Sequence, residues 1–515
     1  NMTIENSHLR MHVLTFKAEA VPCVPRDFGN GGTVCVCNAT FCDSTPELVV
    51  PETGSYVRYT SSQGGLRFNI TEGFFTSEST SYTIFNMFLF GSQWVYKNAF
   101  KNTSCTYPEQ LVKFCVFSCN KHHSNMIVRI YRSYFGKGGS NYNLGRVPIA
   151  GTDFSTRKYT YDDVDDDILL ERFNLADEDL VYKIPLMQKA LTMNPELKFL
   201  AAAWSAPPWM KTNNDFVGFG FLREKYYQLW ADYLLKFLDE YKDYGLEMWA
   251  ISTGNEPSNG IVPISRFNSM GWIPSSVAKW IGDNLGPTIR KSEHKKTLIL
   301  ALDDQRFSLP WFVNRMFTNK LAKNYTDGIA FHWYWDDIIP VSMIERTHNN
   351  FPEKFLIMTE ACVGYQPWEF TKVLLGSWMR GEMYIVDIIE NLKHWVTGWV
   401  DWNLALNKKG GPNWNRNFVD SAIIVNADND EFYKQPLYYA LAHFSKFIPR
   451  NSVRIKLTEK KSSIDSVAFR TPQNEIVLVL YNTLTEDLNV IIRVPERGNM
   501  DLQLPPKSVH TIIYK

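Results

Sequence analysis

The sequence contains no stretch of 18 uninterrupted apolar residues, which excludes a membrane-spanning helix. It carries no net charge, with 54 basic and 54 acidic side chains, and no basic block longer than a few residues. A nucleic-acid partner is therefore not expected. No repeat or low-complexity tract is evident, and no Gly-rich phosphate loop joins a strand to a helix, since residues 136–139 form a turn. No cofactor is implied.

Cysteine is scarce, with 8 residues in 515, but four of them fall within one short Gly- and Pro-containing stretch: Cys23, Cys35, Cys37 and Cys42. Such a stretch buries little apolar surface, so two disulfides are expected to staple it, with their pairing left open. Zinc is the alternative, which the Cys-x-Cys spacing and the lack of a nearby His disfavour. Glycosylation motifs agree with a secretory route and occur at Asn38, Asn69, Asn102 and Asn324.

Hydrophobic and aromatic residues are plentiful. They make up 45% and 14% of the chain, enough for a large core, and 16 Trp and 25 Tyr suit a cleft that stacks flat rings on sugars. The length allows two to four domains, or one barrel with attachments.

The chain is organised around residues 247–257, where Met248–Ser252 reads as one short buried strand. Gly254 and Pro257 end it, so Asn255 and Glu256 fall at its carboxyl end. In a parallel α/β barrel that rim carries the chemistry. An acid beside an amide there suits glycoside cleavage, although a Glu before a Pro is more often simply solvated.

A second apolar run, residues 355–359, ends in Glu360. The spacing from Glu256 accommodates about three βα units of roughly 30 to 40 residues each. Two further candidate strands, 297–303 and 328–333, lie between the acids. Glycoside hydrolysis requires two carboxylates around one bond, so the pair predicts a glycosidase site. The alternative for Glu360 is a buried acid paired with an Arg.

Other segments continue the strand–helix rhythm. Strands are expected at 142–148, 197–203 and 396–402, which brings the barrel to seven. Residues 226–241 repeat apolar side chains at three- and four-residue steps, as a helix with one buried face does. From residue 452 the period drops to two, which predicts antiparallel strands that pair with strands in 46–74 as a β-sandwich.

Several short segments of the sequence, which follow one another in the same order, resemble the glucosylceramidases of glycoside hydrolase family 30. They are Asn255-Glu256-Pro257, His332-Trp333-Tyr334, Thr359-Glu360-Ala361-Cys362-Val363-Gly364, Asp401-Trp402-Asn403 and Gly411-Pro412-Asn413-Trp414. The resemblance covers residues 21–74 and 129–515. It implies an α/β fold: a (β/α)8 TIM barrel with an appended β-sandwich and a small disulfide-bonded N-terminal β region.

The implied domains each combine separate segments of the chain. They are 21–47 with 404–435 for the disulfide-stapled β region, 48–90 with 450–515 for the β-sandwich, and 91–403 with 436–449 for the catalytic barrel.

The resemblance implies a retaining β-glucosidase that hydrolyses glucosylceramide to glucose and ceramide by double displacement. Glu256 would be the general acid/base and Glu360 the nucleophile. Physical chemistry supports this in part. Two close carboxylates repel each other when both are ionised, so one of them should hold a proton. The implied substrate-binding residues are Asp153, Trp204, Asn255, Trp402, Phe267, Gln305, His332, Tyr334 and Arg146.

Individual roles follow the resemblance. Asn255 would bind the sugar 2-hydroxyl, Asp153 the outer hydroxyls, and Trp204 and Trp402 would wall the pocket. Arg146 would keep Glu360 ionised. His332 and Tyr334 would orient the acids, with a satisfied core histidine as the alternative for His332.

Four further residues bear on the cleft. Phe267 and Gln305 would lie at its mouth, near the ceramide tails, where Ser265 replaces a usual aromatic. Cys362 should face the same side of its strand as Glu360. It is not expected to be the nucleophile, because the Glu already fills that role.

Residues 75–128 do not match. The family places a Gly-Phe-Gly-Gly-Ala strand and a helix there, the first βα unit of the barrel, so residues 82–90 become the candidate for the vacant strand position. Cys105, Cys115 and Cys119 before His122-His123 look like zinc ligands only superficially, and no metal is expected. The mismatch keeps open a second hypothesis, an unstable or non-catalytic relative that binds at most a lipid or a receptor.

The resemblance also implies partners and a location. These are the lysosomal lumen with membrane association, reached by the secretory pathway, a saposin-like activator protein, an anionic lipid surface and a lysosomal trafficking receptor.

Overall fold

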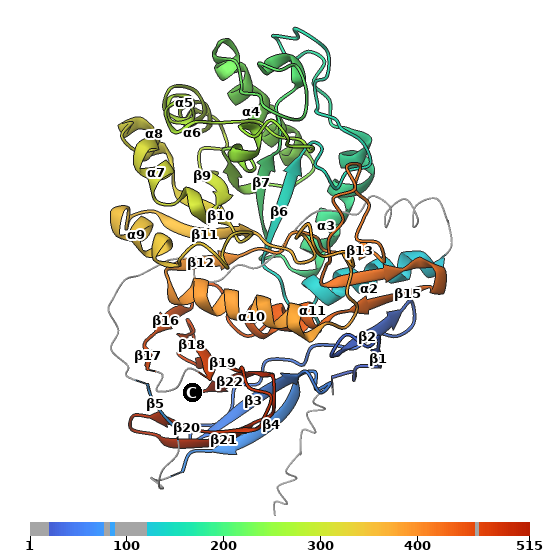
Figure 1. Ribbon diagram of the computed structural model, residues 1–515, viewed down its shortest axis with the longest axis vertical. Coiled ribbons are helices and arrows are strands. Elements are labelled where there is room, and N and C mark those ends of the chain that lie inside the picture. Colours follow the sequence, from blue (N-terminus) through green and yellow to red (C-terminus); the bar gives the residue numbers. More distant parts are fainter. Residues whose placement is uncertain (1–19, 77–82, 88–120, 459–462) are drawn as a thin grey trace, which may run out of the picture.

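The computed structural model describes residues 20–76, 83–87, 121–458 and 463–515. They build a barrel, a two-sheet sandwich and a smaller β region, with helices α10 (Trp378–Lys393) and α11 (Pro436–Ser445) between barrel and sandwich (Figure 1). The chain starts in the small β region, crosses the sandwich, completes the barrel and returns to the sandwich. The expected fold class is confirmed. None of the described helices is long and apolar enough to cross a membrane.

Within the described residues, the barrel sheet has seven parallel strands in the order β12-β11-β10-β9-β8-β7-β6. Its strands are β6 (Leu144–Ile149), β7 (Lys198–Ala203), β8 (Met248–Ser252), β9 (Leu298–Gln305), β10 (Gly328–His332), β11 (Phe355–Glu360) and β12 (Val396–Trp399). All seven predicted strands are therefore confirmed, and their ends differ from the predicted ends by only a few residues. A parallel order brings every carboxyl end to one rim, where the polar residues that follow each strand meet.

The barrel helices follow the strands in sequence. They are α2 (Lys121–Phe135), α3 (Ile184–Met193), α4 (Tyr227–Asp243), α5 (Pro274–Trp280), α6 (Gly286–Lys291), α7 (Trp311–Met316), α8 (Lys320–Tyr325), α9 (Ser342–Asn350) and α10. The predicted stripe of α4 is buried: Trp230, Tyr233, Phe237 and Tyr241 are each no more than 1% exposed. The helix lies along the barrel because that face is apolar.

The sandwich uses both ends of the chain, as expected. Its larger sheet has the order β16-β18-β19-β22-β3-β4 and its smaller sheet β17-β5-β20-β21. The N-terminal strands are β3 (Ser55–Ser62), β4 (Asn69–Phe74) and β5 (Thr83–Met87). The C-terminal strands are β16 (Val453–Ile455), β17 (Leu457–Thr458), β18 (Ile464–Arg470), β19 (Ile476–Asn482), β20 (Leu488–Val494), β21 (Gly498–Leu504) and β22 (Ser508–Tyr514). Strands β3 and β22 pair antiparallel over seven residues, from Ser62↔Ser508 to Tyr56↔Tyr514, and close the sandwich.

The hypothesis that residues 82–90 fill the vacant barrel position is wrong for the part that the structure describes. Strand β5 pairs in parallel with β20 and antiparallel with β17, inside the sandwich. Only the short link 75–82 joins β5 to β4, so the chain crosses to the facing sheet instead of reaching the barrel. Residues 77–82 and 88–120 lie outside the described residues.

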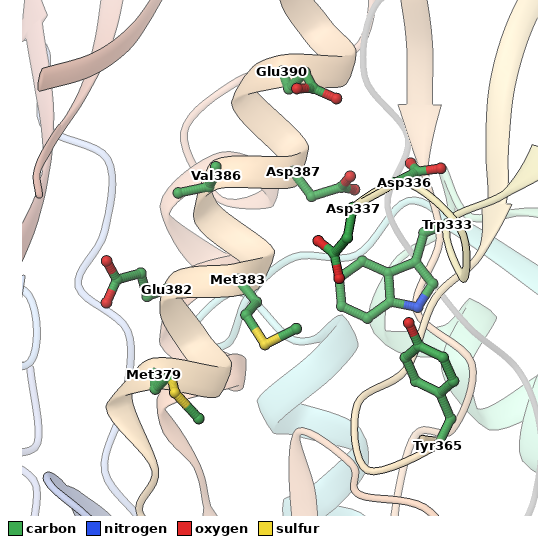
Figure 2. Close-up of a pocket in the computed structure, with 10 residues that line it drawn as sticks. All are labelled: Trp333, Asp336, Asp337, Tyr365, Met379, Glu382, Met383, Val386, Asp387 and Glu390. Carbon is green, nitrogen blue, oxygen red and sulfur yellow. The ribbon is translucent and has the colours of Figure 1, made fainter. Parts of the chain in front are cut away.

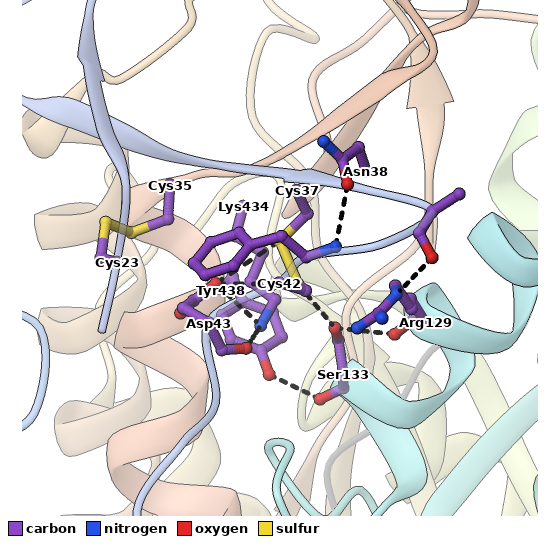
Figure 3. The surroundings of a disulfide bond; sticks show 12 residues. Cys23, Cys35, Cys37, Asn38, Cys42, Asp43, Arg129, Ser133, Lys434 and Tyr438 are labelled. Carbon is purple, nitrogen blue, oxygen red and sulfur yellow. Dashed lines mark hydrogen bonds and ion pairs between the residues drawn. A yellow bond between two sulfur atoms is a disulfide. The ribbon is translucent and has the colours of Figure 1, made fainter. Parts of the chain in front are cut away.

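The small β region is a sheet in the order β1-β2-β15-β14-β13. Its strands are β1 (Pro25–Asp27), β2 (Thr33–Asn38), β13 (Leu406–Asn407), β14 (Ile423–Asn426) and β15 (Glu431–Lys434). Two disulfides hold it, as predicted: Cys23–Cys35 and Cys37–Cys42 (Figure 3). Arg129 of α2 binds the adjoining loop, donating from Nε to the Ala39 carbonyl at 2.8 Å.

Candidate active site

Five barrel strands bring charged side chains to one rim. Arg146 comes from β6, Glu256 from the turn after β8, Asp303 from β9, His332 from the end of β10 and Glu360 from the end of β11. All five are at most 7% exposed. Buried charges are stable only when they are paired, so their contacts with one another decide the geometry of the site.

Glu256 sits in a left-handed backbone conformation, with φ +43°. Its backbone N–H donates to the Asp303 carbonyl at 2.9 Å. Gln305 Nε2 donates to Oε1 at 2.5 Å, His332 Nδ1 lies 2.9 Å from the same oxygen, and Asn259 donates to Oε2. Non-Gly residues at positive φ cost free energy and cluster at functional sites. Here the strained turn holds the Glu256 carboxylate against Gln305 and His332.

Glu360 accepts from two groups. Arg146 Nη1 donates to Oε2 at 2.5 Å and the Tyr334 hydroxyl donates to Oε1 at 2.8 Å. Burial raises the pKa of Glu360 above its usual range, and the cationic His332 and Arg146 oppose this rise. Of the two acids, only Glu360 touches a guanidinium. The alternative raised from the sequence, a buried acid paired with an Arg, therefore describes the contacts of Glu360 correctly. The same side chain also lies in the candidate active site.

The two acids face each other. One carboxylate oxygen of Glu256, one of Glu360 and a ring nitrogen of His332 all lie within 4.8 Å of one another. Retaining glycosidases keep their carboxyl groups about 5–5.5 Å apart, whereas inverting enzymes separate them by about 6.5–9.5 Å to admit a water. The arrangement can therefore attack a sugar carbon directly from one carboxylate while the other serves the leaving oxygen.

Asp303 lies beneath both acids and connects their partners. It accepts from Arg146 Nη2 at 2.9 Å, Ser252 Oγ at 2.6 Å and Thr359 Oγ1 at 2.6 Å, and His332 Nε2 lies at 3.2 Å. Burial alone would raise the pKa of Asp303, but Arg146, His332 and Ser252 together lower it well below its usual range. A fixed negative charge therefore stands under the site.

His332 is a cation in this environment. Burial alone would lower its pKa, but Glu360, Asp303 and Glu256 together raise it to about 10. Arg146 is the second buried cation, held by Asp303 and Glu360. Three carboxylates and two cations thus form one network, in which Asp303 fixes the orientation of both cations.

Asp303→Asn is expected to lower kcat about 10- to 100-fold, in the range found when a group that orients a catalytic residue is removed. An amide cannot supply the negative charge, so the pKa of His332 should fall from about 10 and the basic limb of the pH–rate profile should move to lower pH. Steady-state rates between pH 4 and 9 measure this. Asp283→Asn, at an exposed acid in residues 281–285, is the matched control. A lower rate with an unchanged pH profile would contradict the positioning role.

Trp204 and Trp402 stack beside the acids, with ring centroids 5.0 Å apart and planes 23° apart. The Arg146 guanidinium lies over both rings, 4.9 Å from the Trp204 centroid and 5.7 Å from that of Trp402. Asp153 completes this side: its Oδ2 accepts from Asn413 at 3.0 Å and Asn417 at 3.1 Å. Burial raises the pKa of Asp153 to about 7.

The structure places the remaining predicted residues as follows. The Asn255 Oδ1 accepts from Arg146 Nη2 at 2.7 Å, so Asn255 belongs to the same network. Gln305 is buried beside Glu256, deeper than the cleft mouth to which the sequence assigns it. Phe267 is half-buried against the cluster that contains Trp204 and Trp402. Ser265 lies two residues before it, also half-buried.

Cys362 is a buried free thiol, 3.4 Å from the Tyr334 hydroxyl that also donates to Glu360. Burial raises the pKa of the thiol well above its usual range. The reactive form of cysteine is the thiolate, so the structure supports the expectation that Cys362 is not a nucleophile.

Two groups of side chains among the described residues have the spacing of metal ligands. They are Cys37, Cys42 and Asp43, and Glu256, His332 and Glu360. The two cysteines form a disulfide and offer no thiolate. Both ring nitrogens of His332 already lie against carboxylates, Nδ1 against Glu256 and Nε2 against Asp303. Cys105, Cys115 and Cys119 lie outside the described residues.

Sequence reasoning missed Asp303, Ser252, Thr359 and Asn259. A usable signal existed for Asp303, because Asp303-Asp304-Gln305 follows the apolar run 298–302 in the same way that Glu360 follows 355–359. Positive φ values at Leu302 (+76°) and Asp303 (+55°), which turn the carboxylate inward, have no counterpart in the sequence pattern.

Comparisons with known proteins agree with this geometry. The Glycosyl hydrolase family 30 TIM-barrel domain matches residues 115–448, and the Glycosyl hydrolase family 30 beta sandwich domain matches residues 451–512. The chain is 39% identical over 513 residues to lysosomal acid glucosylceramidase of Mus musculus, covering 96% of each protein. It is 39% identical over 518 residues to putative glucosylceramidase 4 of Caenorhabditis elegans, covering 97% of this chain and 96% of that protein.

A solved structure matches the fold. SrfJ from Salmonella typhimurium superposes with a TM-score of 0.80 at 24% identity, covering 90% of this chain and 99% of that chain. At that identity the likeness concerns the architecture alone.

Proposed function

The chain belongs to glycoside hydrolase family 30, and we propose that it is a retaining β-glucosidase that hydrolyses glucosylceramide to glucose and ceramide. The observation that carries the chemistry is the separation of the two acids, whose nearest oxygens lie within 4.8 Å. The observation that carries the substrate is the similarity, along nearly the whole chain, to the mouse lysosomal acid glucosylceramidase.

In the first step Glu360 attacks the anomeric carbon and Glu256 gives its proton to the glycosidic oxygen, which leaves as the ceramide hydroxyl. The new bond joins a Glu360 oxygen to the sugar and the old carbon–oxygen bond breaks. The Arg146 contact supports Glu360 as the nucleophile, because a guanidinium favours its anionic form. Tyr334 and Arg146 hold one oxygen each and fix the angle of attack.

In the second step a water attacks the same carbon from the side that ceramide has left. Glu256, now a carboxylate, takes a proton from this water, and the bond to Glu360 breaks. Two inversions restore the β configuration. Gln305, Asn259 and His332 hold Glu256 through both steps, since each lies within hydrogen-bond distance of its carboxylate.

The sugar would be bound by the residues around the acids. Asn255 would hold the 2-hydroxyl, because Arg146 fixes its Oδ1 and leaves its amide N–H groups to donate. Asp153 would accept from the outer hydroxyls, and Trp204 and Trp402 would offer flat faces to the ring. We propose that Phe267 lies toward the lipid, from its position at the edge of the tryptophan cluster.

The reaction is tested by following the anomer that forms first. The purified chain is incubated with an aryl β-glucoside and with glucosylceramide in detergent, and the product is read by proton NMR before mutarotation. β-Glucose as the first product is expected. α-Glucose would overturn the retaining mechanism, and turnover of neither substrate would favour the alternative of a non-catalytic lipid or receptor binder.

Apolar side chains on the active-site rim support a lipid partner. Phe370 (96% exposed), Ile264 (81%), Ile338 (71%) and Trp368 (69%) lie in the loops that follow β8, β10 and β11, at the same rim as Glu256 and Glu360. Exposed apolar groups around a site are typical of docking surfaces. We propose that this rim meets an anionic lipid surface and a saposin-like activator protein, and that a lysosomal trafficking receptor delivers the enzyme.

We also propose glycosylation in the secretory pathway. Asn69 and Asn324 are exposed, and Asn38 is half-buried. Asn102 lies outside the described residues.

An enzyme that works in an acidic compartment is expected to be more stable at acidic pH than at neutral pH. Burial raises the pKa of Asp153 and Asp401 to about 7 and that of Asp304 to about 6, above the unfolded value near 4. Their contribution to the free energy of unfolding is complete below about pH 4 and is lost as the pH rises through 6 to 7. Buried His443 and His510, with lowered pKa values, act oppositely, but mainly below about pH 6.5.

The melting temperature is therefore expected to be higher at pH 5.5 than at pH 7.5, by at least about 2 °C. Calorimetry at both pH values measures the difference. Asp401→Asn removes one titrating group and should shrink it. A higher melting temperature at pH 7.5 would contradict the argument.

A further inference from the structure

A cavity of about 540 Å³ lies beside the barrel, between α10 and the loops that follow β10 and β11 (Figure 2). It is separate from the Glu256–Glu360 pair, and neither acid lines it. Met379, Met383, Val386 and Glu390 face it from α10 at intervals of three or four residues, with Glu382 and Asp387 beside them, so one side of the helix forms one wall. Trp333, Asp336 and Asp337 face it from the loop after β10, and Tyr365 faces it from the loop after β11.

The lining carries more negative than positive charge. Five carboxylates border the cavity: Asp336, Asp337, Glu382, Asp387 and Glu390. Two cations reach them. Arg306 pairs with Asp336, Asp387 and Glu390, and Lys507 pairs with Glu382. Asp337 is exposed and forms no ion pair within the part of the chain that the structure describes.

The inner end of the cavity holds a pair of buried acids. The Asp336 side chain is 7% exposed, and its Oδ2 accepts from Arg306. Its Oδ1 is buried, and no nitrogen or hydroxyl donor of the described residues reaches it. Asp387 approaches Asp336 from α10 (Figure 2), and the two carboxyls share a hydrogen bond. Burial and the neighbouring Asp387 raise the pKa of Asp336 well above its usual range, and burial raises that of Asp387 to about 6, so the pair holds a proton that a bound cation would replace.

The other surfaces suit an apolar body. The rings of Trp333 and Tyr365 lie 6.3 Å apart between centroids, with planes at 53°, and form one corner. The thioethers of Met379 and Met383 lie opposite them (Figure 2). Aromatic faces attract ammonium groups through the ring quadrupole, and methionine adapts to alkyl chains of different shape. The volume lies within the range of small-molecule sites, about 300–1,000 Å³.

We propose that this cavity binds an organic cation with an apolar body, of the alkylammonium class. The ammonium group would bind at Asp336 and Asp387, where two buried carboxyls lie together and share one guanidinium, that of Arg306. The alkyl part would lie along the methionines of α10 and against Trp333. A small ligand fits better than a basic side chain from a protein partner, because the acids at the inner end are buried below the helix face.

The test uses the full chain, hexylammonium chloride as the probe and hexanol as its neutral counterpart, with binding measured by isothermal titration calorimetry. One saturable site is expected for hexylammonium and none for hexanol. Asp336→Asn is expected to weaken binding about tenfold, as for the loss of one charge-assisted hydrogen bond. Asp337→Asn, at an exposed position that tolerates substitution, should weaken it severalfold. Val386→Trp should abolish it by filling the cavity.

Two controls locate the probe. Asp283→Asn removes an exposed charge away from the cavity, and Glu360→Gln removes a carboxylate from the active site. Both should leave the affinity for hexylammonium unchanged. Equal binding of hexanol, or full affinity in both Asp336→Asn and Val386→Trp, would overturn the proposal. Loss of binding in Glu360→Gln alone would place the probe in the active site. Binding of a lysine peptide without binding of hexylammonium would assign the cavity to a protein partner and would equally refute it.

Discussion

Glu360→Gln is expected to lower kcat for every β-glucoside by at least about four orders of magnitude, as for the loss of a covalent nucleophile. The amide is nearly isosteric but cannot form the glycosyl–enzyme bond. Its oxygen can still accept from the Tyr334 hydroxyl, which lies 2.8 Å from Glu360 in the native site. Substrate binding should therefore persist while turnover stops, and the loss should appear in kcat, with the dissociation constant for a β-glucoside nearly unchanged.

The matched control is Glu171→Gln, at an exposed acid outside the hydrogen-bond network of Glu360. Rates with an aryl β-glucoside and binding of a non-hydrolysed thioglucoside measure the two quantities. Because Arg146 also binds Asp303 and Asn255, losing one carboxylate should not unfold the site. A variant that keeps more than about a hundredth of the native kcat would remove Glu360 from the nucleophile's role.

Much of the fold could be predicted from local patterns. Each barrel strand is a short apolar run that ends in polar or aromatic residues, and the parallel sheet turns that repetition into one polar rim. The helix α4 could be predicted because its buried stripe has the 3.6-residue period. The domain boundaries remain predictions.

Strand β5 shows the limit of prediction from such local patterns. β-Branched and aromatic residues mark 82–90 as strand-like, yet the sheet that β5 joins is decided by its partners β17 and β20, which lie some 370 to 410 residues further along the chain. Composition carries no information about a distant partner. The domain boundaries implied by the resemblance place this segment in the sandwich, whereas the local pattern alone left it as a candidate for the barrel.

The positions of the two proposed catalytic acids at strand ends could be predicted, but the residues that support them could not, for a related reason. Asp303 contacts Arg146, Ser252, His332 and Thr359, which lie 157, 51, 29 and 56 residues away. Each of these residues alone is compatible with an ordinary strand end. Only closure of the barrel brings them together, and the pKa of about 10 at His332 arises from that assembly.

Glu256→Gln is expected to lower the rate on glucosylceramide by about three orders of magnitude, within the range for loss of general acid–base catalysis. The ceramide oxygen is a poor leaving group that needs a proton. Aryl β-glucosides with acidic phenols need none, so their first step should proceed almost normally. Their second step should slow, because no base activates the water, and a burst of phenol should precede a slow steady state.

The product formed with azide shows which acid is the nucleophile and which is the acid/base, because azide is a nucleophile that needs no base. In Glu256→Gln it should attack the glycosyl–Glu360 intermediate, raise the steady-state rate and yield the β-glucosyl azide, with net retention. The neutral amide, unlike the carboxylate that it replaces, does not repel the anion. Product analysis by proton NMR reads the configuration. An α-glucosyl azide from this variant would mean that azide had replaced the nucleophile itself, and Glu256 and Glu360 would have to exchange roles.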